Sequence, residues 1–303
     1  MSQFAPIALI VYARPEHTRR TLESLRNNTL ADQSELYVFA DGPKADASEE
    51  TQENIAEVRR IVREIGWPSP IHFDEQETNR GLDNSIIHAV TMLTEKYGRV
   101  IVVEDDLVLG KGFLEFINKG LDLYEDSANV FGVTGYISPT KRQMPPSYFL
   151  PVFSSWGWGT WKRAWDTFTH DPEGLYESIM RLPEPVQERF DFGKMPNREM
   201  LHNIITQGKT TCWDVCTNAT MFLKDMLFLY PGQSLVQNTG YDGTGSNCIP
   251  QETFYSSVRA TDFQPIEKIA PQLEKKWVDA VAKARRANHK PTLQTRAIRR
   301  IKR

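Results

Sequence analysis

The chain has 303 residues, of which 40% are hydrophobic and 25% are charged, and its formal net charge is −3. This composition is that of an ordinary globular protein that can bury a sizeable core. No apolar segment reaches membrane-spanning length and the N-terminus lacks the basic segment of a signal peptide, so we expect a cytoplasmic protein.

The predicted elements alternate between strand and helix over the first ~135 residues. The predicted strands are 7–12, 36–40, 71–73, 99–103 and 130–133, and the predicted helices begin near Pro15 and Ser48 and span 84–97 and 110–126. This alternation is typical of a doubly wound, mostly parallel sheet in the α/β class. After about Tyr148 aromatic residues, Gly and Pro become dense, which indicates a second lobe built against the same sheet.

Three consecutive acids, Glu104-Asp105-Asp106, directly follow the apolar strand 99–103. In an open α/β sheet, ligands bind outside the carboxyl ends of the strands. Neighbouring carboxylates repel one another, and Mg²⁺ or Mn²⁺ would offset that repulsion while also binding phosphate groups. The triplet therefore suggests a nucleotide-sugar site. The alternative is a solvated acidic turn.

Two further candidates lie near predicted strand ends. Asp41 ends the strand 36–40 and could accept the imide N–H of a uracil ring, or could simply form the Asp-Gly-Pro turn. Arg80 stands in the loop 79–82, where it could bind phosphate or help to hold Asp41. The alternative is that Asn79 and Gly81 only shape this loop.

The densest aromatic cluster runs from Trp156 to Trp165. Indole faces stack well on sugar rings, so Trp156 and Trp158 are candidates for a sugar or acceptor site, with a core role as the alternative. We expect Trp161 and Trp165, four residues apart, to be core residues of one helix.

Two further candidate segments come later in the chain. Asp214 precedes a predicted helix over 215–224, where it is either the helix N-cap or a base for an acceptor hydroxyl. The Gly-rich stretch 230–247 is either a surface loop or a lid over a sugar diphosphate. Its candidate binding residues are Asn238, Gly240, Asp242 and Gly243.

Several other site types are excluded. The chain lacks the Gly-Lys-Ser/Thr of a phosphate loop and the Gly-x-Gly-x-x-Gly of a dinucleotide site. The three cysteines, Cys212, Cys216 and Cys248, are odd in number and loosely spaced, so we expect reduced thiols without a disulfide framework or zinc knuckle.

The charge is distributed unevenly along the chain. From residue 271 onward eleven Lys and Arg stand against two acids, a net of +9, which leaves −12 for the rest. An acidic body with a basic tail does not describe a nucleic-acid-binding protein. The tail either touches an anionic membrane surface or is a solubilising, partly disordered segment.

These motifs together resemble nucleotide-sugar glycosyltransferases of the GT-A fold, in particular those related to the N-acetylglucosaminyltransferase I type and bacterial sugar transferases. The resemblance spans 7–247 and is strongest over 100–116. It implies that Asp106 binds Mn²⁺, that Glu104 and Asp105 contact the ribose or donor sugar, and that Asp41 contacts uracil.

The resemblance also implies an inverting reaction with the base in the Trp213-Asp214 segment. This chain has Trp-Asp-Val where a second Asp is expected, so Asp242 is a rival for the base.

The predicted function is transfer of a hexosyl or N-acetylhexosaminyl group from a UDP-sugar to a hydroxyl acceptor, such as a surface polysaccharide or glycolipid precursor, with Mn²⁺ or Mg²⁺. We expect a nucleotide-sugar-binding half over 1–148, an acceptor and catalytic half of the same domain over 149–265, and a helical, then partly disordered tail over 266–303. The alternatives are a sugar nucleotidyltransferase, which normally carries a basic Gly-rich loop absent here, and a non-catalytic glycan-binding protein.

Overall fold

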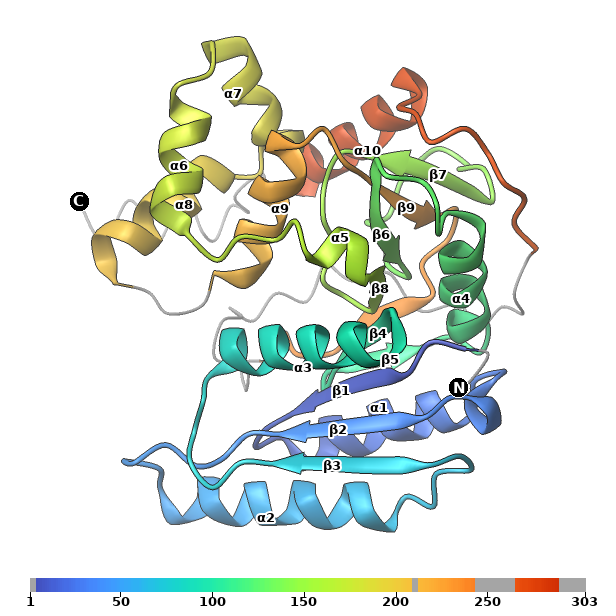
Figure 1. Ribbon diagram of the computed structural model, residues 1–303, viewed down its shortest axis with the longest axis vertical. Helices are drawn as coiled ribbons and strands as arrows, with labels where there is room; N and C mark the ends of the chain where they lie inside the picture. The colour runs from blue at the N-terminus through green and yellow to red at the C-terminus, as the bar shows by residue number, and fades with distance from the viewer. Residues whose placement is uncertain (1–3, 209–211, 243–264, 289–303) are drawn as a thin grey trace.

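The computed structural model describes residues 4–208, 212–242 and 265–288. Within these residues one eight-stranded sheet has the order β3-β2-β1-β4-β8-β6-β9-β7 (Figure 1). Four of its seven neighbouring pairs are parallel, which confirms the predicted α/β class with a mostly parallel sheet. Its strands are β1 Ile7–Val11, β2 Leu36–Ala40, β3 Ile71–Glu75, β4 Arg99–Glu104, β6 Val130–Thr134, β7 Ser147–Leu150, β8 Trp158–Trp161 and β9 Leu227–Pro231.

The first half of the sheet forms as predicted because its strands are short apolar runs that helices cover. Strands β1 and β2 are buried along their whole length and pair in parallel. Pro15 lies in the first turn of α1, and the Ser48 side chain caps α2 by accepting the N–H of Thr51. The helices of this half are α1 Pro15–Arg26, α2 Glu49–Glu64, α3 Leu82–Tyr97 and α4 Phe113–Leu123, with the short 3₁₀ turn η1 Ala31–Gln33 after α1.

The second half contributes strands to the same sheet. Strand β8 lies between β4 and β6 and is antiparallel to both. Trp161 therefore belongs to β8, and only the short helix α5 (Lys162–Trp165) follows, so the prediction of one helix through both Trp161 and Trp165 is wrong. Both side chains are nevertheless buried, as expected of core residues.

A group of helices extends beyond the sheet in the upper left of Figure 1. Leu175, Ile179, Phe190 and Leu201 bury their side chains in a second apolar cluster among these helices. The helices are α6 Pro172–Met180, α7 Glu184–Phe190, α8 Asn197–Gln207 and α9 Trp213–Leu223, with the 3₁₀ turn η2 Phe192–Lys194 between α7 and α8.

The described part of the basic C-terminal segment packs onto the body. The Tyr124 hydroxyl donates to the carbonyl of Ile269 and accepts its N–H, and Asn129 donates to the carbonyl of Pro271. Helix α10 (Lys275–Asn288) then contacts η2. Residues 289–303 lie outside the described residues. None of the described helices is long and apolar enough to cross a membrane.

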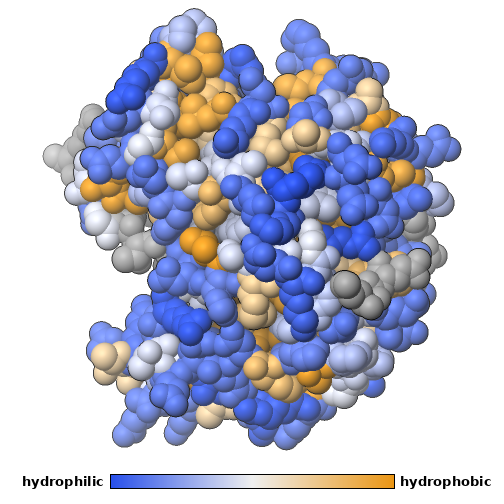
Figure 2. Space-filling view, viewed as in Figure 1, coloured by the Kyte–Doolittle hydropathy of each residue, from blue (hydrophilic) through white to orange (hydrophobic). Residues whose placement is uncertain are grey.

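Strands β1, β2 and β3 run in the same direction, toward the left of Figure 1. On that side the outline of the molecule is hollowed between the sheet half and the helices above it (Figure 2). Strand β5 (Leu107–Leu109) comes directly after β4 in the chain, and it pairs with β10 (Val236–Asn238) in a two-stranded ribbon. This arrangement places the acidic triplet at the carboxyl end of β4, as predicted.

Candidate functional site

The acidic triplet joins β4 to β5: Glu104 is the partly exposed last residue of β4, and the next two acids form a buried turn. Asp105 is 4% exposed and Asp106 is 8% exposed, so a solvated acidic turn is ruled out. The Thr21 hydroxyl donates to the Asp105 carbonyl at 2.7 Å, and the Thr239 N–H donates to the Asp106 carbonyl at 2.8 Å. The backbone of the triplet is therefore held from both α1 and the loop after β10.

The carboxylates of the triplet destabilise one another. Burial raises the pKa of Glu104 well above its ordinary value, and the charges of Asp106, Asp105 and Asp214 raise it further. Burial also raises the pKa of Asp105 to about 6, although Arg14 opposes this increase. Such clustered, strongly shifted acids are characteristic of functional sites.

Arg14 supplies the cation of this site, and sequence reasoning missed it. Its guanidinium forms ion pairs with Asp105 and with the Asp106 carboxylate, the latter at 3.1 Å. The position of Arg14 shortly after β1 could have indicated this role. Because β1 and β4 are parallel neighbours, their carboxyl ends lie at the same edge of the sheet.

The loop after β10 packs against the triplet. The Thr239 hydroxyl donates to the Asp106 carbonyl at 3.0 Å, and the Asn238 side chain accepts the Gly240 N–H at 2.8 Å. His17 of α1 lies 3.3 Å from the Thr239 carbonyl oxygen and 3.2 Å from an Asp242 carboxylate oxygen. The structure thus brings Asn238, Gly240 and Asp242 close to the triplet. Gly243 lies outside the described residues.

Gly240 lies directly against the Asp106 carboxylate, so a side chain at position 240 would require that carboxylate to move. A Cβ atom there would lie 2.2 Å from Oδ2 of Asp106 and 3.0 Å from Nη1 of Arg14. The glycine therefore allows this loop to cover the charged cluster.

Asp41 organises the neighbouring loop. Its carboxylate accepts N–H groups from Gly42, Arg80 and Gly81 and from the Asn79 side chain, at 2.7–2.9 Å. A carboxylate offers about four acceptor positions, so these bonds satisfy it within the protein. Arg80 and Asp41 line a shallow cavity at the carboxyl ends of β2 and β3. Its other lining residues are Phe39, Ala40, Asp74, Gln76, Ser85 and His88.

Asp214 lies in the first turn of α9. The N-cap of this helix is Cys212, so the prediction of Asp214 as the N-cap is wrong. Burial raises the pKa of Asp214, and the Asp214 charge contributes to the raised pKa of Glu104. The start of α9 is fixed by Asp83 of α3, which accepts the N–H groups of Cys212 and Trp213 at 2.7 and 3.0 Å.

The two candidate stacking residues occupy different environments. Trp158 is 0% exposed and stacks on Trp213 at 5.8 Å, so it has no face for a sugar and that expectation is corrected. Trp156 is only partly buried, and its ring lies 4.3 Å from that of Tyr136 and 5.9 Å from that of Tyr241. Trp156 thus adjoins the loop that covers the triplet.

The triplet fits a divalent cation by its chemistry. Three carboxylates supply hard oxygen ligands, and Arg14 compensates only one of their charges. Oxygen ligands of this kind suit Mn²⁺ or Mg²⁺. Asp106 remains the expected direct ligand.

Replacing Glu104 with Gln should stabilise the metal-free protein, and the gain should grow with pH. The folded-state pKa of Glu104 lies above its unfolded value of about 4.3, so its contribution to stability is lost as pH rises through the folded pKa. We expect the Tm difference between E104Q and the parent in EDTA to be near zero at pH 4 and a few degrees by pH 8, since about 1 kcal/mol shifts Tm by roughly 2–4 °C.

The matched control is Glu53→Gln on the exposed surface of α2. A Tm difference for E104Q that stays flat with pH, or that E53Q reproduces, contradicts the mutual repulsion of the triplet.

Replacing Gly240 with Ala should lift the covering loop from the triplet. Overpacking of this kind costs about 1–3 kcal/mol, so hydrogen exchange at the Thr239 amide should accelerate by about tenfold or more. Gly208→Ala controls for a general loss of stability, because its φ of +63° strains a side chain although nothing lies within 4 Å of it, and it should leave the protection of Thr239 unchanged. Unchanged protection of Thr239 in G240A would show that the loop tolerates a side chain there.

Comparison with known proteins agrees with this geometry. The family model described as glycosyl transferase family 2 matches residues 7–182, more than half of the chain. The matched segment includes Arg14, Asp41, Arg80 and the acidic triplet. No curated protein matches the chain.

Two solved structures are similar. One is a protein from Desulfovibrio desulfuricans G20 described as a nucleotide-diphospho-sugar transferase, with 15% identity, 55% of this chain and 68% of that chain covered, and a TM-score of 0.32. The other is mouse xyloside xylosyltransferase 1 in its apo form, with 14% identity, 74% and 83% covered, and a TM-score of 0.38. Both similarities are low, so the assignment depends on the family model: the chain belongs to glycosyl transferase family 2.

Proposed function

We propose that this glycosyltransferase transfers a sugar from a UDP-sugar to a hydroxyl group of a glycan or glycolipid acceptor. The observation that carries the proposal is the buried acidic triplet, which meets Arg14 and the 238–242 loop at the carboxyl end of β4. A diphosphate with a divalent cation is the ligand class that matches this combination of charges.

The donor diphosphate would bind beside Arg14 and Asp106, which form an ion pair at 3.1 Å in this structure. Arg14 would exchange the Asp106 carboxylate for phosphate oxygens, and Asp106 would then hold Mn²⁺ or Mg²⁺. When bound, the cation neutralises the diphosphate and acts as a Lewis acid. Glu104 and Asp105 face the ribose or donor sugar. The covering loop keeps water from the bond that breaks, which favours transfer over hydrolysis.

The base of the nucleotide would lie by the cavity at the ends of β2 and β3. Asp41 holds the Arg80 loop in place there through its hydrogen bonds. The direct uracil contact expected of Asp41 stays a prediction, and it requires one of these bonds to be exchanged for the imide N–H.

Asp214 would accept the proton of the acceptor hydroxyl. The hydroxyl oxygen attacks the anomeric carbon as the bond to the diphosphate breaks, so a single displacement inverts the anomeric centre. Trp156 borders the acceptor. In this scheme residues 1–148 bind the donor and residues 149–265 supply the base. A lipid-linked acceptor would bring the basic segment after residue 271 to an anionic membrane surface.

A donor screen tests the metal-dependent activity. We expect UDP release from a panel of UDP-sugars in Mn²⁺ with acceptor, and a loss of at least about 100-fold in EDTA or in Asp106→Asn. Asp166→Asn, which changes an exposed carboxylate, should retain activity. UDP release insensitive to both EDTA and D106N would reject the metal assignment. Pyrophosphate release from a nucleoside triphosphate with a sugar phosphate would instead indicate nucleotidyl transfer and reject glycosyl transfer.

Replacing Asp214 with Asn should separate catalysis from donor binding. We expect donor affinity within about twofold of the parent and transfer reduced by roughly 10²–10⁴-fold, which is the usual contribution of a general base. Asp242→Asn is the matched variant on the covering loop. If D214N keeps full turnover while D242N loses it, Asp242 is the base.

A further inference from the structure

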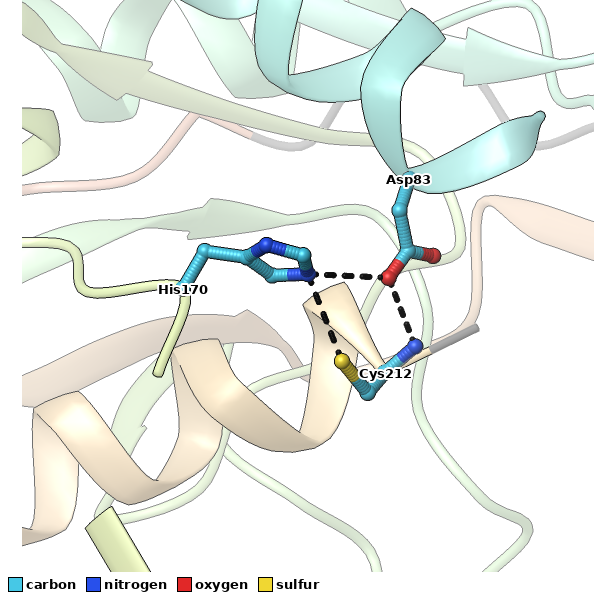
Figure 3. A group of neighbouring side chains, drawn as sticks. All are labelled: Asp83, His170 and Cys212. Carbon is cyan, nitrogen blue, oxygen red and sulfur yellow. Dashed lines mark hydrogen bonds and ion pairs between the residues drawn. The ribbon is translucent and has the colours of Figure 1, made fainter. Parts of the chain in front are cut away.

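A second cluster of side chains lies beside the start of α9 and takes no part in the proposed reaction (Figure 3). Asp83 comes from the first turn of α3, His170 from the segment before α6, and Cys212 from the N-cap of α9. The Asp83 Oδ2 atom lies 3.1 Å from Nε2 of His170, and Sγ of Cys212 lies 3.3 Å from the same nitrogen. All three ligand-type atoms lie within 4.8 Å of one another.

The geometry does not fit nucleophilic catalysis by a cysteine. In such a site the two ring nitrogens of the histidine serve different partners, one the nucleophile and the other the orienting carboxylate. Here both Asp83 and Cys212 face Nε2, and the other ring nitrogen lies on the far side of the ring (Figure 3). The three atoms therefore converge on one region, as metal ligands do.

The cluster also holds buried negative charge. Asp83 is 5% exposed, and its Oδ1 atom has no hydrogen-bond partner among the described residues. The carboxylate therefore keeps one buried acceptor oxygen that no described residue satisfies, and a bound cation would satisfy it.

We propose that Asp83, His170 and Cys212 bind Zn²⁺ or a similar thiophilic divalent cation, at a site separate from the acidic triplet. Oxygen, imidazole and thiolate ligands at about 2.0–2.3 Å in tetrahedral geometry lie roughly 3.3–3.7 Å apart. The two distances to Nε2 of His170, 3.1 and 3.3 Å, differ from this range by a few tenths of an ångström, and the Asp83 and Cys212 ligand atoms lie within 4.8 Å of each other. The His170 side chain is 37% exposed, which leaves access for the ion and for a water molecule as the fourth ligand.

Such a cation would join α3 to α9. The Asp83 oxygen that faces His170 also accepts the N–H groups of Cys212 and Trp213, directly before Asp214. The bound ion would therefore fix the position of Asp214. This consequence rests on the proposed role of Asp214, whereas the site itself does not.

Titration of the full-length protein with Co²⁺ tests the site. Cobalt substitutes for zinc, and a bound thiolate gives a charge-transfer absorption in the near ultraviolet. We expect this band to saturate at one equivalent and to be displaced by Zn²⁺. Cys212→Ser should abolish it, and His170→Asn should weaken Co²⁺ binding by more than about tenfold, since loss of even an outer partner of a ligand costs 10–100-fold.

The controls are Cys216→Ala, which keeps the three ligands, and Asp106→Asn, which alters only the triplet; both should retain the band. Absence of the band at one equivalent overturns the proposal, as does a band that persists in C212S or is unaffected in H170N. Far-ultraviolet circular dichroism verifies folding, and the partly exposed His170 provides the test if C212S does not fold. None of these outcomes depends on UDP release, so the site and the proposed function can fail separately.

Discussion

The structure around the site depends on three adjacent carboxylates, two of them buried and paired with one cation, Arg14, among the described residues. Arg14 satisfies Asp105 and Asp106, and hydrogen bonds from α1 and from the loop after β10 hold the backbone carbonyls of these two residues. The close approach at Gly240 brings the loop after β10 directly against the Asp106 carboxylate. The site is thus assembled at a cost in stability, which is typical of a centre prepared for a charged ligand.

Much of the first half of the fold could be predicted because its signals are local. Strands β1, β2 and β4 are short apolar runs, and Pro15 and Ser48 mark helix starts. Strand β8 could not be predicted in this way. Its four residues, Trp-Gly-Thr-Trp, show no alternation of apolar and polar side chains, and they pair with β4 on one side and β6 on the other. Composition likewise could not show that Trp158 faces the core while Trp156 lies near the surface.

The same distinction applies to the site. The triplet was predictable because its residues are consecutive and follow an apolar strand. Arg14 and His17 were missed because their partners lie far along the chain, 91 residues away for the pair of Arg14 with Asp105. The cluster of Asp83, His170 and Cys212 comes from three separate segments, and only the folded chain brings them together.

The position of β8 has a consequence for how the chain folds and how it can be divided. Because β8 lies between β4 and β6, the donor-side strands and the strands of the second half share one continuous set of backbone hydrogen bonds. A fragment that ended near residue 148 would lack both β8 and β9, and would leave the edges of β4 and β6 open to pairing with other chains. Because the two halves share one sheet, exchange of a whole half would break its central strand pairs, so under the proposed function new acceptor specificities are expected to arise in the helices and loops outside the sheet.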